Sequence, residues 1–161
     1  MTGELAALGL ASGFPEDPTF VGSWVNGQAN ARLRDTVTID GPFSGSVEIA
    51  RVGLRVHGTL DGFALLHSEI QARNAFSFSP SLFRRECYST FVRGCLRLSP
   101  DSPVEVDYVS FLDYPFSAEN PSFVLVTGLG AVGRNEGEAD AGATAQLFID
   151  LPLGFTFTSE S

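Results

Sequence analysis

Apolar and polar residues alternate along much of the chain. The clearest case is Gln28–Asp40, in which the odd positions are apolar except for Asp35 and the even positions are polar. A period of two places residues of one kind on one face of a β-strand. The pattern therefore predicts a half-buried strand, and Asp35 is expected to mark a strand end or a β-bulge.

The next alternating stretch changes phase. Apolar residues lie at odd positions at Val47 and Ile49 and at even positions within Val52–Leu60, so we expect a β-bulge near Arg51. Asp61-Gly62 is a strong signal for a two-residue hairpin turn. Because the alternation continues beyond this turn, the sequence predicts two long strands that pair as a hairpin.

The sequence predicts four further strands, whose apolar and polar residues alternate more regularly in some than in others. Tyr88–Leu98 is the least regular, and Val104–Phe111 and Glu138–Ile149 alternate well. Phe123–Leu129 is apolar on both faces, which favours a central strand.

No helical period with caps persists over three turns. The fold class expected is all-β, an antiparallel β-sandwich of jelly-roll-like or Greek-key type with little helix. At 161 residues the chain fits one domain, with residues 1–18 as an irregular N-terminal segment and residues 19–161 as a single β-sandwich domain.

Charge narrows the possible partners. The formal net charge of -9 repels phosphate backbones and anionic lipid surfaces, so nucleic acid is not an expected partner. No stretch approaches the roughly 18 apolar residues of a membrane-spanning helix, so direct membrane insertion is not expected. Met1–Gly13 has no basic residue before its apolar part and does not fit a signal peptide.

Two segments far apart share a pattern. Gly27-Gln-Ala-Asn-Ala31 continues to Ile39-Asp40 and then Pro42, and Gly137-Glu-Ala-Asp-Ala141 continues to Ile149-Asp150 and then Pro152 at the same offsets. Two copies do not make a solenoid. The pattern predicts two equivalent strands of one sandwich.

Three segments carry a likeness to a known family. They are Ala29-Asn-Ala-Arg-Leu-Arg-Asp35-Thr-Val-Thr-Ile-Asp-Gly-Pro42, Gly53-Leu-Arg-Val-His-Gly-Thr-Leu60, and Ala139-Asp-Ala-Gly-Ala-Thr144-Ala-Gln-Leu147 with Leu151-Pro152-Leu-Gly154. Together they resemble the extracellular body region of bacterial PEP-CTERM proteins, the substrates of exosortase-type processing.

The resemblance implies export and association with an extracellular matrix, with no assigned chemistry. The Pro-Glu-Pro signal, hydrophobic tail and terminal arginines of that family do not follow Ser161. Either the sorting tail has been removed or the likeness is superficial.

One glycine motif suggests a cofactor but lacks the required setting. Gly128-Leu-Gly130-Ala-Val-Gly133 matches the G-x-G-x-x-G pattern of dinucleotide-binding proteins. That site needs a helix after the glycines, whereas Arg134–Gly137 leads into another alternating strand. We therefore expect a glycine-rich loop and no bound cofactor.

The two cysteines, Cys87 and Cys95, enclose a short excursion and are expected to form a disulfide in an exported domain, with two free thiols as the alternative. His57 and His67 flank the expected hairpin turn and could share a metal if they lie opposite each other. Both fall on polar faces, so solvated histidines are the favoured interpretation.

Carboxylates and aromatic residues offer the remaining chemistry. Glu136, Glu138 and Asp140 follow the glycines at a spacing of two and could hold calcium on one strand face, although a solvated acidic face is the favoured interpretation. Glu105 and Asp113 could form a glycosidase pair only at a suitable separation. Exposed aromatic residues could stack on sugar rings, or pack in the core; the candidates are Trp24, Tyr88, Tyr108 and Tyr114.

No catalytic motif is present, and the sequence names neither a catalytic residue nor specific carbohydrate-binding residues. The expectation is a non-enzymatic secreted or cell-surface structural protein associated with an extracellular matrix. Its expected partners are extracellular polysaccharide or further copies of itself. The alternatives are a carbohydrate-binding module, with calcium as a possible cofactor, and a subunit of a self-assembling filament or shell.

Overall fold

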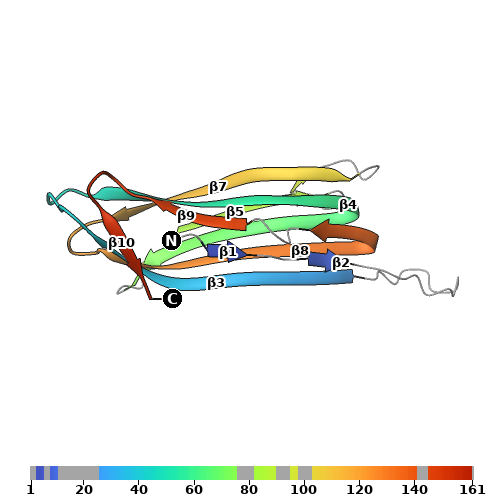
Figure 1. Cartoon of the computed structure of the whole chain (residues 1–161), viewed down its shortest axis with the longest axis horizontal. Helices are drawn as coiled ribbons and strands as arrows, with labels where there is room; N and C mark the ends of the chain where they lie inside the picture. The colour runs from blue at the N-terminus through green and yellow to red at the C-terminus, as the bar shows by residue number, and fades with distance from the viewer. Residues whose placement is uncertain are drawn as a thin grey trace, which may run out of the picture.

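The computed structural model describes residues 3–5, 8–10, 26–75, 82–89, 95–97, 103–140 and 145–160, which form strands and turns with no helix (Figure 1). Within this part of the chain there is therefore no helix that could cross a membrane. The predicted all-β fold is confirmed. The strands are β1 (Gly3–Leu5), β2 (Leu8–Leu10), β3 (Asn26–Asp40), β4 (Glu48–Asn74), β5 (Leu82–Ser89), β6 (Leu96–Arg97), β7 (Val104–Phe116), β8 (Ser122–Asp140), β9 (Ala145–Asp150) and β10 (Thr156–Ser159).

These strands belong to one sheet in the order β1-β9-β4-β8-β3-β10, with β7 and β5 also paired to β4, β2 to β8 and β6 to β5. Every pairing is antiparallel except that of β5 with β6. The short strands β1 and β2 join β9 and β8. Gly3–Leu5 and Leu8–Leu10 are therefore part of the sheet, although they lie in the segment expected to be irregular.

The long strand β4 folds back at Asp61-Gly62 and contributes to two layers (Figure 1). Its first arm, residues 48–60, pairs with β7 and β9 and, at Thr59 and Leu60, with the end of β8. Its second arm, residues 63–74, pairs with β8 and β5. Gly62 has a φ of 58°, which glycine adopts without steric cost, and the register with β8 shifts there. The predicted hairpin is wrong, because the two arms pair with other strands.

The two layers face each other in the manner of a β-sandwich. The first layer consists of β1, β9, the first arm of β4 and β7, and the second consists of β5, the second arm of β4, β8, β3 and β10. Tyr114 on β7 stacks on Phe123 on β8, with ring centroids 4.5 Å apart. The space between the layers is filled by apolar side chains that are almost fully buried, among them Val52, Leu54, Leu66, Ile70, Phe116, Leu125 and Leu129.

Strand β3 confirms the predicted alternation, since Val37 and Ile39 are buried. Its register with β8 runs without a shift from Asn26 to Thr38, so the expected strand end or bulge at Asp35 is wrong. Asp35 is buried in mid-strand and accepts hydrogen bonds from Ser159 Oγ (2.5 Å) and from the backbone N–H of Glu160 (3.1 Å). The carboxylate therefore ties the end of β10 to β3.

The bulge expected near Arg51 is also wrong. The pairing of β4 with β7 has no register shift from Glu48 to Leu60, and apart from Gly53 the buried residues of the first arm have even numbers. Val47 and Ile49 are instead exposed apolar residues, 66% and 46% accessible. The sequence pattern misled because these two residues are apolar but face solvent.

Two predicted strands are divided. In place of Tyr88–Leu98, β5 ends at Ser89 and β6 lies parallel beside it, while residues 90–94 lie outside the description. Of the predicted strand Glu138–Ile149, residues 138–140 belong to β8 and residues 145–149 to β9, both paired with β4, while residues 141–144 lie outside the description. The turns that follow the two copies still meet, since the Phe43 and Phe155 rings lie 5.2 Å apart.

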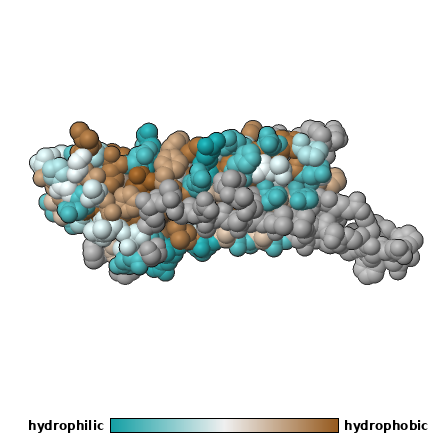
Figure 2. All heavy atoms as spheres, in the orientation of Figure 1, coloured by the Kyte–Doolittle hydropathy of each residue, from teal (hydrophilic) through white to brown (hydrophobic). Residues whose placement is uncertain are grey.

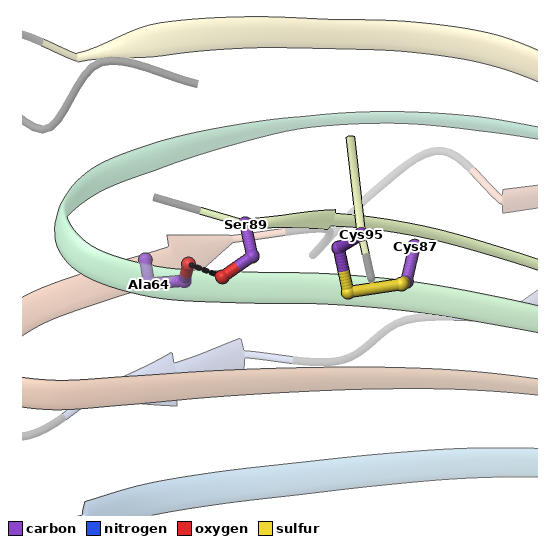
Figure 3. The surroundings of a disulfide bond; sticks show 4 residues. All are labelled: Ala64, Cys87, Ser89 and Cys95. Atoms are coloured by element: carbon purple, nitrogen blue, oxygen red, sulfur yellow. Dashed lines mark hydrogen bonds between the residues drawn. A yellow bond between two sulfur atoms is a disulfide. The ribbon is translucent and has the colours of Figure 1, made fainter. Parts of the chain in front are cut away.

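The predicted disulfide between Cys87 and Cys95 is confirmed, with Cα atoms 4.9 Å apart (Figure 3). It links β5 to the chain just before β6. Two residues beyond Cys87, the buried Ser89 hydroxyl donates a 3.3 Å hydrogen bond to the Ala64 carbonyl oxygen of β4. Strand β5 is therefore fixed to β4 on one side and to β6 on the other.

Candidate functional site

The G-x-G-x-x-G motif lies inside the central strand β8, so the expected glycine-rich loop is wrong. A Cβ atom at Gly130 would lie 2.1 Å from His67 Cε1 and 2.8 Å from Asn30 Oδ1, and one at Gly128 would lie 2.9 Å from Glu69 Cγ. The glycines leave room for side chains from the neighbouring strands β3 and β4 to lie across β8.

The two histidines lie on the outer faces of different layers and do not share a site. His57 is in the first arm of β4, opposite Asp107 of β7, whereas His67 is in the second arm, beside Gly130. Burial lowers the pKa of His67, the nearby Arg85 lowers it further, and Glu69 opposes both. Its imidazole is therefore held toward the neutral form.

The three candidate calcium ligands stand in the last part of β8. Glu138 is exposed and pairs with Asp61, and Asp140 is half-buried and pairs with Thr59. The side chain of Glu136 lies outside the described part of the structure. Among the described residues, no group of three or more His, Cys, Asp or Glu side chains could hold a metal, so the calcium site stays a prediction.

Glu105 and Asp113 do not form a glycosidase pair. Both lie on β7, eight positions apart, which corresponds to roughly 27 Å along an antiparallel strand. Glycosidases need their two carboxyl groups about 5–9.5 Å apart. Asp113 is instead bound to Arg51.

The aromatic residues singled out from the sequence do not form an exposed platform. The rings of the half-buried Tyr88 and Tyr108 lie 4.5 Å apart against the core, and Tyr114 is buried against Phe123. Trp24 lies outside the described residues. These three tyrosines serve packing between the layers.

A different pair of aromatic residues, one exposed and one half-buried, lies on the outer face of the first layer. Phe111 on β7 and Phe148 on β9 are the two cross-strand partners of Gly53 in β4. The Phe148 ring lies over this glycine, because a Cβ atom there would be 2.2 Å from Phe148 Cζ. The two rings meet edge to face with centroids 6.0 Å apart, and Phe111 is 46% exposed.

Two ion pairs flank the rings. Arg51 donates two hydrogen bonds to Asp113 (2.8 and 3.1 Å), and its guanidinium carbon lies 5.6 Å from the Phe111 ring centroid. Arg55 donates two hydrogen bonds to Asp107 (2.8 and 3.1 Å). We call these six residues, Phe111, Phe148, Arg51, Asp113, Arg55 and Asp107, the aromatic face.

The ion pairs hold their side chains in the charged form. Hydrogen bonds from Arg55 and Arg51 lower the pKa values of Asp107 and Asp113, and the same contacts raise those of the arginines. Each guanidinium uses two of its five N–H donors on its partner, so donors remain for a ligand. A hollow of about 330 Å³ adjoins the second pair and is lined by Arg55, His57, Asp107 and Gln146.

The arrangement suits a ligand with both apolar and hydroxyl surfaces. Aromatic rings offer flat apolar area, and the paired charged groups offer donors and acceptors in fixed orientations. On the side of the molecule where β7 and β9 lie, hydrophobic and hydrophilic residues are mixed on the surface (Figure 2). Such a mixture is typical of surfaces that bind sugars, whose rings have an apolar face and a rim of hydroxyls.

Comparison of the chain with protein-family models, with curated proteins and with solved structures found no match. The site therefore rests on its own geometry. Sequence reasoning missed Phe111, although a signal was available: it occupies the same alternating face as Asp107 and Asp113, so a period of two already places it in solvent. The same alternation places Phe148 on the polar face with Gln146, but its contact with Phe111 depends on their shared cross-strand partner Gly53.

Proposed function

We propose that this protein is a secreted, non-enzymatic β-sandwich that associates with an extracellular matrix by binding polysaccharide on its aromatic face. The observation that carries the proposal is the contact between the exposed Phe111 and the half-buried Phe148, which lies over Gly53, flanked by two bidentate ion pairs. Large aromatic side chains that stay exposed on an ordered sheet are characteristic of binding surfaces.

The ion pairs contribute orientation more than stability. Exposed pairs such as Arg51–Asp113 contribute little to folding. They do hold two guanidiniums and two carboxylates at fixed places beside the rings, which reduces the entropy lost when a ligand binds. A sugar stacked on Phe111 would find hydroxyl partners on both sides.

Two further observations support an extracellular location. The Cys87–Cys95 disulfide is of a kind that persists in oxidising compartments. The sequence segments that resemble the body of PEP-CTERM proteins imply export to a matrix. Neither observation names the polysaccharide.

The test is a screen of the protein against a broad array of glycans and exopolysaccharides, in calcium and again in chelator. The double variant F111A/F148A is expected to lose binding. F63A is the matched control, because Phe63 is also exposed (43%) but lies at the bend of β4. If binding were lost in chelator, calcium would be needed for binding, and Glu138 and Asp140 would be its candidate ligands. Turnover of a hydrolase substrate by the purified protein, or array binding that F111A/F148A leaves intact, would contradict the proposal.

Self-association through β7 is a second candidate function. Within the described residues, this 13-residue strand pairs only with β4, and a long edge with one free side can accept another strand. Its exposed residues Glu105, Asp107 and Asp113 oppose pairing of β7 with a copy of itself, since like charges would meet. Light scattering that shows only monomer at high concentration would exclude this candidate.

A further inference from the structure

A second charged surface lies on the outer face of the other layer. Arg32 and Arg34 project from β3, and Arg73 projects from the second arm of β4, with β8 between the two strands. The register places Arg34, Val126, Gln71 and Phe83 in one row across β3, β8, β4 and β5. We call Arg32, Arg34, Arg73 and Phe83 the arginine face.

These arginines have no carboxylate partner among the described residues. Arg51, Arg55 and Arg84 each form an ion pair, whereas in the part of the chain that the structure describes no ion pair or side-chain hydrogen bond involves Arg32, Arg34 or Arg73. Three like charges placed together on a sheet repel each other. In a chain of formal charge -9, where carboxylates are abundant, three neighbouring guanidiniums that form no ion pair with a described residue favour an anionic ligand.

The arginines surround a hollow in the sheet surface. Its volume is about 430 Å³, and it is lined by Arg32, Arg34, Gln71, Arg73 and Val126. Val126 is buried and forms part of its apolar lining, while the three arginines are exposed around it. A volume of this size falls in the range of small-ligand sites, which begins at about 300 Å³.

Phe83 gives the face a second kind of contact. It is 54% exposed and is the direct cross-strand partner of Gln71, so both side chains lie on the same side of the sheet. Phe83 stands three strands away from Arg34, a distance of roughly 14 Å at ordinary strand spacing. An extended ligand that stacks on the ring can therefore also reach the guanidiniums.

Taken together, the contacts favour an anionic sugar polymer over other polyanions. Guanidiniums bind carboxylate and sulfate groups with two parallel hydrogen bonds, and the ring of Phe83 accepts the apolar face of a sugar. Glu69 lies in the same cross-strand row as Arg32, and the chain as a whole is acidic. A densely charged phosphodiester backbone is therefore disfavoured, whereas a polymer with about one charge per sugar is tolerated.

We propose that the arginine face binds acidic polysaccharide, with Arg32, Arg34 and Arg73 holding the sugar carboxylate or sulfate groups and Phe83 stacking on a sugar ring. This inference rests on the proposed association with an extracellular matrix and adds a separate site on the opposite layer. The oxoanion on a sugar ring is the shared chemistry, and a carboxylated and a sulfated polymer distinguish the two sources.

The experiment measures binding of the whole chain to polygalacturonate, dextran sulfate and uncharged dextran by titration calorimetry at low and high NaCl. Polygalacturonate or dextran sulfate is expected to bind, dextran is not expected to bind at this face, and added salt is expected to weaken binding. R34Q is expected to lower the affinity about tenfold, the loss of one charge-assisted contact. The triple variant R32Q/R34Q/R73Q is expected to abolish binding.

R84Q is the matched control, because it removes one exposed positive charge from an arginine already paired with Glu86. F83A tests the stacking contact and is expected to weaken polymer binding while leaving its salt dependence unchanged. E69Q is expected to strengthen binding by removing a neighbouring negative charge. If R34Q and R84Q lowered the affinity for the polymer equally, binding would depend only on net charge and the proposal would be overturned.

Two other outcomes also decide the matter. Single-stranded DNA that binds as tightly as polygalacturonate would overturn the assignment to sugar. F111A/F148A is expected to leave binding of the acidic polymer unchanged, so that this test and the test of the aromatic face fail independently. If that double variant instead abolished acidic-polymer binding, the ligand would belong to the aromatic face and the arginine face would be excluded.

Discussion

The Tyr108 hydroxyl on β7 donates a 2.9 Å hydrogen bond to Ser68 Oγ on the second arm of β4, across the interior between the two layers. Ser68 is fully buried, so its hydroxyl depends on this contact. The bond joins the two arms of β4 indirectly, because β7 pairs with the first arm. It is a polar contact between layers whose facing side chains are mostly apolar.

Removal of this hydroxyl is expected to destabilise the fold. Y108F leaves Ser68 without its partner, and an unsatisfied buried polar group costs about 1–3 kcal/mol. S68A is expected to relieve part of this loss when combined with Y108F, because the unpaired group is then gone. Urea unfolding of both single variants and the double variant measures the coupling. Strictly additive effects would show that the two hydroxyls do not interact.

High pH is expected to weaken the fold. Burial raises the pKa of Tyr108 well above its ordinary value of 10.0, the bond to Ser68 opposing it, and burial also raises the pKa values of Tyr88 and Tyr114. The folded state therefore keeps protons that the unfolded state loses above pH 10, and stability falls as pH rises through that range. Urea midpoints at pH 8 and pH 11 check this. If the urea midpoint of Y108F fell between pH 8 and pH 11 as much as that of the wild type, Tyr108 would not be a cause of the loss of stability.

The disulfide is expected to stabilise the fold through its closed loop. The double variant C87S/C95S is expected to lower the free energy of unfolding by about 2.5 kcal/mol, the loop-entropy value for a ring of this size. Denaturation with and without dithiothreitol checks the same contact in the wild type. We expect dithiothreitol to lower the unfolding midpoint of the wild type and to leave that of C87S/C95S unchanged. No change in either protein would contradict this prediction.

The sequence predicted single strands well but not their assembly into layers. Alternation correctly placed Val37 and Ile39 in the core, because a period of two fixes which side of a strand is apolar. Asp61-Gly62 was misread, since a turn signal does not determine whether the two arms pair with each other or separate into different layers. The two faces could not be predicted from the local sequence pattern for a similar reason. The neighbours of Phe148 and Phe83 are set by the strands that pair with theirs.

Substitution of Gly53 is expected to alter the aromatic face without changing either ring. In G53A the new methyl group would occupy the place of the Phe148 ring, 2.2 Å from Cζ, so the ring must move. Affinity for the polysaccharide is expected to fall about tenfold, with a stability loss of about 1–3 kcal/mol. G128A is the control, because its methyl group displaces the flexible Glu69 side chain on the other layer. If G53A bound the polysaccharide as tightly as the wild type does, Phe148 would not be part of the binding site.

The flanking carboxylates are expected to titrate at unusually low pH. Hydrogen bonds from Arg51 and Arg55 lower the pKa values of Asp113 and Asp107 below the ordinary 3.8, so their small stabilisation is present above that pH and is lost as pH falls below it. Carbon-13 NMR titration measures both carboxyl groups. In R51Q the pKa of Asp113 is expected to return toward 3.8 while Asp107 stays low, and a simultaneous return of both would show that they respond to net charge.

The most direct test of polysaccharide binding on the aromatic face is a calorimetric titration with the array ligand that gives the strongest signal. Wild type, F63A and F111A/F148A are compared after circular dichroism has shown equal melting temperatures. The account predicts saturable binding by wild type and F63A and none by F111A/F148A. Equal affinities for all three proteins would contradict it.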